Sequence, residues 1–78
     1  MLKPDLSYAV EQRIRLIDFL LFHYGTVRRG ALRDYFGISE PQASNDLGLY
    51  QELAPGNMAY DMHAKLYRRT DTFERIYP

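Results

Sequence analysis

Three segments of the chain carry apolar residues at helical spacing. In the first segment these residues lie three and four positions apart, as on one face of an α-helix: Val10, Ile14, Ile17, Leu21 and Tyr24. The pattern predicts a helix over residues 8–24. Ser7 is its expected N-cap, and Gly25 follows as a glycine that can end the helix.

The next two segments predict a pair of helices joined by a tight turn. A short helix over residues 29–36 has an expected apolar side made of Ala31, Leu32, Tyr35 and Phe36. Gly37 ends this helix, and we expect Ile38 to be buried in the turn. A third helix, over residues 40–53, starts after Ser39, which forms a Ser-x-x-Gln capping box. Its expected core residues are Ala43, Leu47, Tyr50 and Leu53.

The remaining elements are short strands. Residues 58–60 and 66–68 each contain a tyrosine, a residue that favours strands, and they predict a hairpin with its loop at residues 61–65. Thr26 and Val27 are β-branched and leave room for a further stub of strand. The expected fold is therefore mainly α with a small β-hairpin: a winged helix-turn-helix of three helices plus a wing.

Length and composition fit one folded domain. The chain has 78 residues, of which 46% are hydrophobic and 26% charged. We assign the domain to residues 1–69 and expect residues 70–78, which lose the pattern, to begin a linker. The chain has no cysteine and no run of 18 apolar residues, so we expect no disulfide, no thiolate metal site and no membrane partner. A cytoplasmic location is the natural expectation.

Charge alone gives little support for a nucleic-acid partner. Ten basic residues balance ten acidic ones, and the net charge is zero. The basic residues nevertheless form two clusters, which are Arg28, Arg29 and Arg33, and then Lys65, Arg68 and Arg69. A chain of balanced charge can present one basic face, so binding of nucleic acid depends on where these basic residues lie.

The third helix carries the expected base contacts. If its core residues face inward, Gln42, Ser44 and Asn45 lie on or beside the opposite face. Gln42 and Asn45 carry amides, which can bind adenine bidentately in the major groove of double-stranded DNA, and Ser44 can bond a base or a phosphate. The alternative is that all three are ordinary surface residues, with Gln42 serving the capping box. Gly48 either admits a close approach to DNA or is a tolerated surface position.

A second group of residues is expected to contact the DNA backbone. Arg28 and Arg29 open the second helix, where cations are unfavourable next to the helix dipole, and this favours a functional reason for them. In the predicted wing Lys65 is charged at pH 7, whereas His63 is mostly neutral and is better explained as a plain loop residue. The expected backbone contacts are Arg28, Arg29, Arg33, Ser39, Lys65 and Tyr67.

The first helix is apolar on nearly all sides. Beyond its main face, further apolar residues surround it, namely Leu16, Phe19, Leu20 and Phe22. A helix of this kind is usually buried on more than one side. We therefore expect a homodimer contact or a contact with a C-terminal segment here, and the alternative is a large core without a partner.

Catalysis has little support in the sequence. His23 and His63 are far apart and lack partners at metal-ligand spacing, and the chain has no phosphate-binding glycine loop. We expect no enzyme activity, no metal, no cofactor and no small-molecule ligand in this segment. The main rival to DNA binding is a winged helix used as a protein-interaction module. A small nucleic-acid-processing enzyme is a much weaker alternative.

The turn and the third helix resemble a known family. The segment Phe-Gly-Ile-Ser-x-x-Gln-Ala-Ser-x-Asp-Leu-x-x-Tyr at residues 36–50 resembles the helix-turn-helix of WYL-domain transcriptional regulators, in particular the BrxR/CapW-like regulators associated with bacterial phage defence. Leu-Ala-Pro-x-Asn-x-x-Tyr-Asp at residues 53–61 and Lys-x-Tyr at residues 65–67 extend the resemblance through the wing. The resemblance covers residues 8–78.

The resemblance implies a dimeric repressor on a palindromic operator, acting at the bacterial nucleoid. It places the third helix in the major groove and the wing on the backbone. Gln42, Ser44 and Lys65 match the family pattern, and Asn45 occupies a variable position suited to operator preference. Family members continue into a WYL domain and a dimerisation extension, which this chain lacks. Their ligand sensing therefore does not carry over to it.

Overall fold

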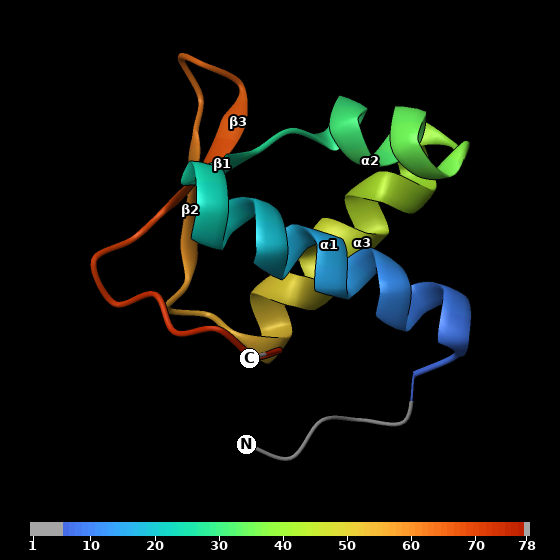
Figure 1. Cartoon of the computed structure of the whole chain (residues 1–78). Coiled ribbons are helices and arrows are strands. Elements are labelled where there is room, and N and C mark those ends of the chain that lie inside the picture. Colours follow the sequence, from blue (N-terminus) through green and yellow to red (C-terminus); the bar gives the residue numbers. More distant parts are fainter. Residues whose placement is uncertain (1–5, 78) are drawn as a thin grey trace.

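A computed structural model describes residues 6–77 of the chain. Residues 1–5 and 78, at the ends of the predicted domain and linker, lie outside the described residues. The element order is α1 (Tyr8–Tyr24), β1 (Thr26–Val27), α2 (Arg29–Phe36), α3 (Glu40–Leu53), β2 (Met58–Asp61) and β3 (Leu66–Arg69). In Figure 1, α1 crosses α3, α2 lies above α3, and the β2–β3 hairpin stands beside the C-terminal end of α1. The predicted three helices with a wing are confirmed.

Local signals set the helix boundaries. The Ser7 side chain accepts a hydrogen bond from the backbone N–H of Val10, and Ser39 accepts one from that of Gln42. At the other ends of α1 and α2, Gly25 and Gly37 adopt left-handed conformations with φ of 76° and 66°. Side chains are strained there, and glycine is not. The predicted N-cap residues and terminal glycines are thus the observed ones. The predicted capping box is only half formed, because the Gln42 side chain bonds Asp46 and not the backbone N–H of Ser39.

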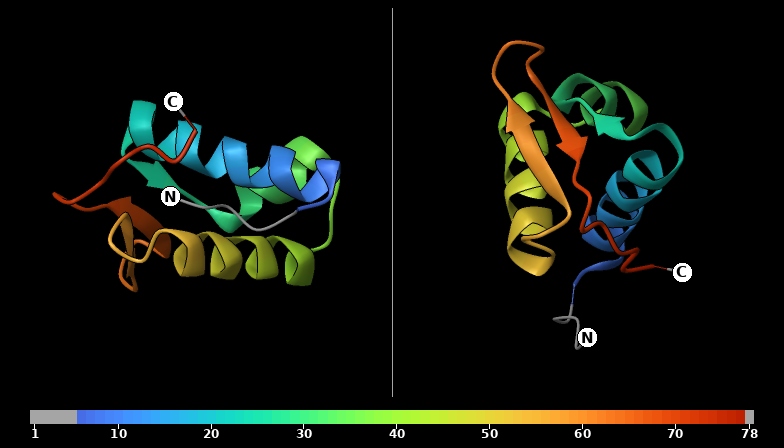
Figure 2. Two further views of the ribbon diagram at one scale, coloured as in Figure 1. Left: turned by 90° about the horizontal axis from the view of Figure 1, so that it is seen from below. Right: turned by 90° about the vertical axis from the view of Figure 1, so that its left-hand side faces the viewer.

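The three strands form one antiparallel sheet in the order β1-β3-β2. Strand β3 is central: Val27 pairs with Tyr67 on one side, and Tyr60 pairs with Tyr67 on the other. The predicted stub at residues 26–27 therefore serves to attach the wing to the helices. Figure 2 shows the hairpin loop projecting beyond the helices, next to the start of α2. None of the described helices is both long and apolar enough to cross a bilayer.

The core lies where the three helices meet the sheet. Its fully buried apolar side chains come from every helix: Ile14, Ile17 and Leu21, Leu32, and Ala43, Leu47 and Tyr50. Burying each large one contributes about 1.5–3 kcal/mol. The core face fixes the rotation of α3 and thereby decides which of its residues face the solvent.

Some expected core residues are exposed instead. Tyr24 is 71% exposed because the chain turns away at Gly25 immediately after it. On α2, Tyr35 is 73% exposed and Ala31 is also exposed, so Leu32 is the one fully buried residue of this short helix. Ile38 in the turn is half-buried against the core, short of the complete burial expected.

The segment after β3 packs on the domain. Residues 70–77 form no regular helix or strand, as predicted, but Tyr77 is buried and Phe73 and Ile76 pack against the core. The buried carboxylate of Asp18 in α1 accepts hydrogen bonds from the backbone N–H groups of Ile76 and Tyr77. Over its described residues 70–77, the segment expected to begin a linker is therefore part of the folded unit, because long-range polar contacts hold it there.

The polar contacts of this segment reach α3 as well. The Tyr50 hydroxyl donates to Asp18 at 2.6 Å and accepts from the Asn57 amide at 3.0 Å. Asn57 also donates to the carbonyl of Glu74 at 2.7 Å. Burial and the bond to Asp18 raise the pKa of Tyr50 well above that of an ordinary tyrosine, so it remains a hydrogen-bond donor. One network thus joins α1, α3 and the C-terminal segment.

Candidate nucleic-acid interface

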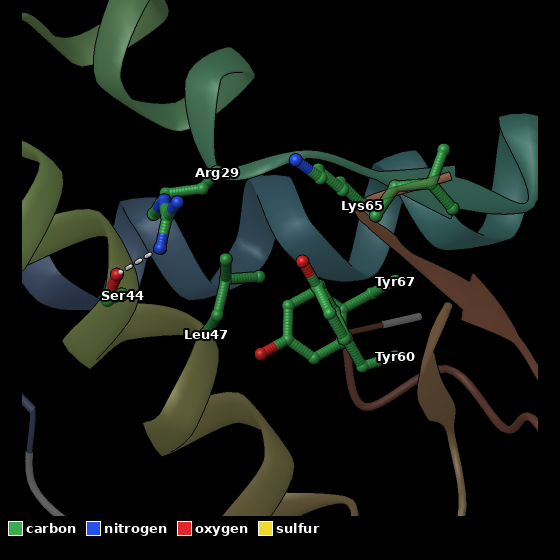
Figure 3. A pocket seen from close by; sticks show the side chains of 7 residues that line it. Arg29, Ser44, Leu47, Tyr60, Lys65 and Tyr67 are labelled. Atoms are coloured by element: carbon green, nitrogen blue, oxygen red, sulfur yellow. Dashed lines mark hydrogen bonds between the residues drawn. The ribbon is translucent and has the colours of Figure 1, made fainter. Parts of the chain in front are cut away.

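A hollow of about 200 Å³ separates α3 from the wing. Its lining combines basic, hydroxyl and aromatic side chains: Arg29, Ser44, Leu47, Tyr60, Lys65, Leu66 and Tyr67. Figure 3 shows the tyrosine rings extending from the strands toward Leu47 and the Lys65 side chain extending toward the same hollow. Residues from α2, α3 and the hairpin, far apart in sequence, therefore meet at one surface.

The predicted base-contact residues differ in their surroundings. Asn45 is exposed, whereas Gln42 and Ser44 are half-buried. The Ser44 hydroxyl accepts a hydrogen bond from Arg29 at 3.1 Å, as Figure 3 shows. The Gln42 amide nitrogen donates to the carboxylate of Asp46 at 3.0 Å, so this amide turns along α3 and only partly faces solvent. Asn45 thus faces solvent as predicted, whereas Gln42, predicted on the same wet face, is half-buried with its amide held by Asp46.

Two arginines connect the start of α2 with the rest of the interface. Arg28 donates to the carbonyl of Ala64 in the wing at 3.1 Å, and Arg29 donates to Ser44 of α3. Both side chains are exposed, and each guanidinium has five N–H donors, so one such bond leaves others for phosphate oxygens. These bonds hold Arg29 at the hollow, where Lys65 also lies, and hold Arg28 against the wing.

Arg33 has a different environment from the other predicted backbone contacts. Its guanidinium bonds the carboxylates of Asp34 at 3.0 Å and Glu40 at 2.7 Å. The hydrogen bond with Asp34 is the main reason that the pKa of Arg33 is raised. Since both carboxylates compensate its positive charge, Arg33 offers less free charge to a phosphate than Arg29, which bonds the Ser44 hydroxyl. Ser39 is exposed at the same end of α3, where its hydroxyl caps the helix.

Asp61 organises the tip of the wing. Its carboxylate accepts hydrogen bonds from the backbone N–H groups of His63 and Ala64 at 2.9 and 3.0 Å, and from Arg68 at 2.7 Å. Lys65 follows with φ of 56°, a left-handed conformation that is unusual outside glycine. The turn therefore fixes where Lys65 leaves the hairpin, while His63 remains an exposed loop residue.

This arrangement predicts an acid-sensitive wing. The N–H of Ala64, and then the Arg68 guanidinium, lower the pKa of Asp61 below its ordinary 3.8. Because the folded-state pKa is the lower one, the stabilisation is present above about pH 4 and is lost as the pH falls through the folded-state value. We expect the side-chain carboxyl signal of Asp61 in NMR spectra to stay constant from pH 7 to pH 5 and to move only below about pH 4. A midpoint above pH 4 would contradict this.

Tyr60 is a candidate that sequence reasoning missed. It is 51% exposed and packs edge-on against Tyr67, with ring centroids 4.9 Å apart, at the wing side of the hollow. In the sequence, Tyr67 was predicted as a backbone contact, whereas strand propensity alone explained Tyr60. The signal that could have found Tyr60 is register, because Tyr60 and Tyr67 are opposite each other in the hairpin and share one face.

Gly48 lies exposed on α3, and a Cβ atom there would meet no atom within 4 Å apart from the neighbouring backbone of its own helix. The fold therefore does not require glycine at this position. We expect Gly48→Ala to raise the free energy of unfolding by about 0.5–1 kcal/mol, because alanine loses less backbone entropy in a helix. Urea denaturation checks this, and an unchanged or lower midpoint would contradict it. A more stable variant that binds DNA less tightly would assign the glycine to close approach of the backbone.

The expected interaction surface on α1 is only partly open. Phe19 and Phe22 are 42% and 41% exposed, while Leu16 and Leu20 are half-buried against the core. The C-terminal segment contacts part of this surface, since Arg75 lies over the Phe22 ring at 4.3 Å from its centroid. An open groove remains on the other side, lined by Gln12, Arg15, Leu16, Phe19, Tyr35 and Phe36.

Comparison with known proteins agrees with this structure. The BrxR transcriptional regulator winged helix-turn-helix domain matches residues 9–77. The chain is 48% identical over 75 residues to the DNA-binding transcriptional repressor CapW of Escherichia coli (strain KTE188), which is 96% of this chain and 25% of that protein. It is 44% identical over 76 residues to CapW of Pseudomonas aeruginosa, with 97% and 25% covered.

A third relative, CapW of Stenotrophomonas maltophilia, is 45% identical over 71 residues, which is 91% of this chain and 24% of that protein. The chain thus spans about a quarter of the length of these relatives. The matched region includes all three helices, the sheet and the packed C-terminal segment. The resemblance seen in the sequence is confirmed: the chain belongs to the family of BrxR transcriptional regulator winged helix-turn-helix domains.

Proposed function

We propose that this chain is the DNA-binding domain of a bacterial transcriptional repressor. In this proposal α3 enters the major groove of duplex DNA, and the wing and the start of α2 contact the phosphate backbone. The observation that carries it is the hollow between α3 and the wing, where Arg29, Lys65 and Ser44 meet. The relatives are named as DNA-binding transcriptional repressors, which supports the same assignment.

In the proposed interface, one group of residues contacts the DNA backbone and another contacts the bases. Arg28, Arg29 and Lys65 supply phosphate contacts that are independent of sequence, with Tyr67, Ser39 and Arg33 as further, weaker contacts. Gln42, Asn45 and Ser44 read base edges. The proposed DNA contacts need no cofactor, metal or small-molecule ligand. The family is one of transcriptional regulators, which is not an enzyme class.

Salt-dependent binding tests the proposal. A duplex that the chain retains from a random pool should be titrated at several salt concentrations. Three phosphate contacts predict that affinity falls about 40-fold between 50 and 200 mM salt, because each contact releases condensed counterions. Absence of binding to any duplex at low salt, with the fold intact, would overturn the proposal.

Recognition of the DNA bases by α3 gives a separate prediction. Gln42→Ala and Asn45→Ala should each weaken binding to the selected duplex by about 1–3 kcal/mol and leave binding to random DNA nearly unchanged. Competition titrations with the two duplexes measure this difference. Equal losses on both duplexes would show that the outer side of α3 does not read bases.

We also propose that the working protein is a homodimer on a palindromic operator. The open apolar groove beside Phe19 on α1 supports a contact of this kind, and the relatives, of whose length this chain spans about a quarter, have further residues for additional contacts. The same groove favours the rival function, a protein-interaction module. Size-exclusion chromatography with light scattering tests the dimer: a strict monomer at high concentration, also when bound to DNA, would contradict it for this chain.

A further inference from the structure

A buried carboxylate lies directly beneath the outer side of α3. Asp46 is only 1% exposed, and its two oxygens face two different elements. From α1, Arg13 donates through Nε to Oδ2 at 2.5 Å and through Nη2 to Oδ1 at 3.3 Å. From one turn earlier on α3, the amide nitrogen of Gln42 donates to Oδ1 at 3.0 Å. The predicted base-reading amide is thus held from inside the protein.

The chemistry of this contact fixes the orientation of the Gln42 amide. A carboxylate paired with a guanidinium has no proton to donate, so it accepts hydrogen bonds only. The nitrogen end of the Gln42 amide must therefore face Asp46, since the oxygen end would be repelled. One N–H is used in this bond, and the second N–H and Oε1 remain for another partner. Adenine offers an acceptor and a donor that match this pair.

Asn45 shows what the same chemical group does without such support. It is exposed, and within residues 6–77 no hydrogen bond holds its side chain. Its amide is free to turn either end toward a base. The structure therefore distinguishes two neighbouring amides, one adaptable and one fixed by a buried ion pair.

We propose that Asp46, clamped by Arg13, is a positioning residue that sets the base preference of Gln42. The inference rests on the proposed DNA-binding function and deepens it, because it assigns part of the specificity to residues that do not touch DNA. An ion pair that only joined α1 to α3 would affect stability and all DNA sequences alike. A positioning role affects one base pair more than the others.

The first experiment needs neither DNA nor a variant. NMR measurement of side-chain amide exchange in the unmodified chain should show the Gln42 amide protons exchanging with water at least about fivefold more slowly than those of Asn45. Equal exchange rates would overturn the inference, because the amide would then not be held.

The second experiment measures specificity. The base pair that Gln42 reads is first located as the position where Gln42→Ala loses discrimination. At that position the unmodified chain should prefer one base pair by about 10-fold or more, and Asp46→Asn should reduce the preference to less than about threefold. The asparagine amide can donate or accept, so it no longer dictates which end of Gln42 turns outward. Binding to random DNA should change much less.

Asp18→Asn is the matched control. Like Asp46→Asn, this variant removes the charge of a buried carboxylate. Asp18, however, lies in α1, contacts Tyr50 and the C-terminal segment, and has no bond to Gln42. It should keep the full preference at the Gln42 position. An equal preference in Asp46→Asn and the unmodified chain would overturn the inference and leave the proposed function standing. Absence of any duplex binding by the unmodified chain would instead overturn the proposed function, together with the role of Asp46 in specificity.

Discussion

Replacing Asp18 by alanine is expected to lower the free energy of unfolding by about 3–5 kcal/mol, the largest effect of any single substitution considered for this chain. The carboxylate is 1% exposed and accepts hydrogen bonds from the Tyr50 hydroxyl at 2.6 Å and from two backbone N–H groups of the C-terminal segment. Removing it leaves these buried donors without their acceptor. Each such donor costs about 1–3 kcal/mol when unsatisfied.

A loss of this size is a large part of the stability of a small domain. For 78 residues the total is on the order of 4–12 kcal/mol, and the melting temperature should fall by more than about 12 °C. Thermal unfolding followed by circular dichroism measures the change. Asp71→Ala is the control, because Asp71 is an exposed aspartate in the same C-terminal segment, and it should change stability by less than about 0.5 kcal/mol. Equal melting temperatures for the two variants would contradict the role given to Asp18.

Removing the two cations at the hollow should have the largest effect on DNA binding. The double variant Arg29→Ala and Lys65→Ala is expected to bind a selected duplex about 100-fold more weakly at low salt, since each charged hydrogen bond to a phosphate contributes about 1.5 kcal/mol. The salt dependence should also become shallower, with the slope of log K against log salt reduced in magnitude by about 2. Fluorescence anisotropy titrations at several salt concentrations measure both quantities.

The chain offers a control with the same change in charge. Arg15 and Arg75 are also exposed, but they lie over the rings of Tyr77 and Phe22, away from the hollow. The double variant Arg15→Ala and Arg75→Ala should keep nearly all of the affinity and the full salt slope. Similar losses in the two double variants would mean that net charge, and not the position of Arg29 and Lys65, governs binding.

Local patterns in the sequence were enough to predict most of the fold. Helix periodicity, with Ser7, Gly25, Gly37 and Ser39 at the boundaries, predicted all three helices with the bounds that the structure shows. Each hairpin strand is one residue longer at its C-terminal end than the sequence predicted. These features are local, because caps and turns depend on residues three or four positions apart.

The polar interior could not be predicted in the same way. The bonds from Asp18 to the segment at Tyr77 span 58 and 59 positions, so the segment that lacked a pattern could not be seen to pack. The ion pair of Arg13 and Asp46 spans 33 positions. One signal was present, since Asp18 and Asp46 are each flanked by core residues in their helices. A carboxylate on the inner face of a helix indicates a buried polar partner.

The candidate site was predicted in outline and differs in detail. The sequence grouped the basic residues correctly by element, but Arg33 is neutralised by Asp34 and Glu40, and Arg29 is bonded to Ser44. Gln42 was expected on a wet surface and is instead half-buried on Asp46. Side-chain pairing of this kind depends on distances between elements, which helical periodicity does not contain.

In the proposed complex, DNA covers the outer side of α3 together with the wing. Its most direct test is to titrate the isotope-labelled chain with a selected duplex and to map the NMR signals that move. We expect the largest shifts at Ser44, Asn45 and Lys65, with little change around Phe19 on α1. Largest shifts around Phe19, with α3 and the wing unchanged, would contradict it.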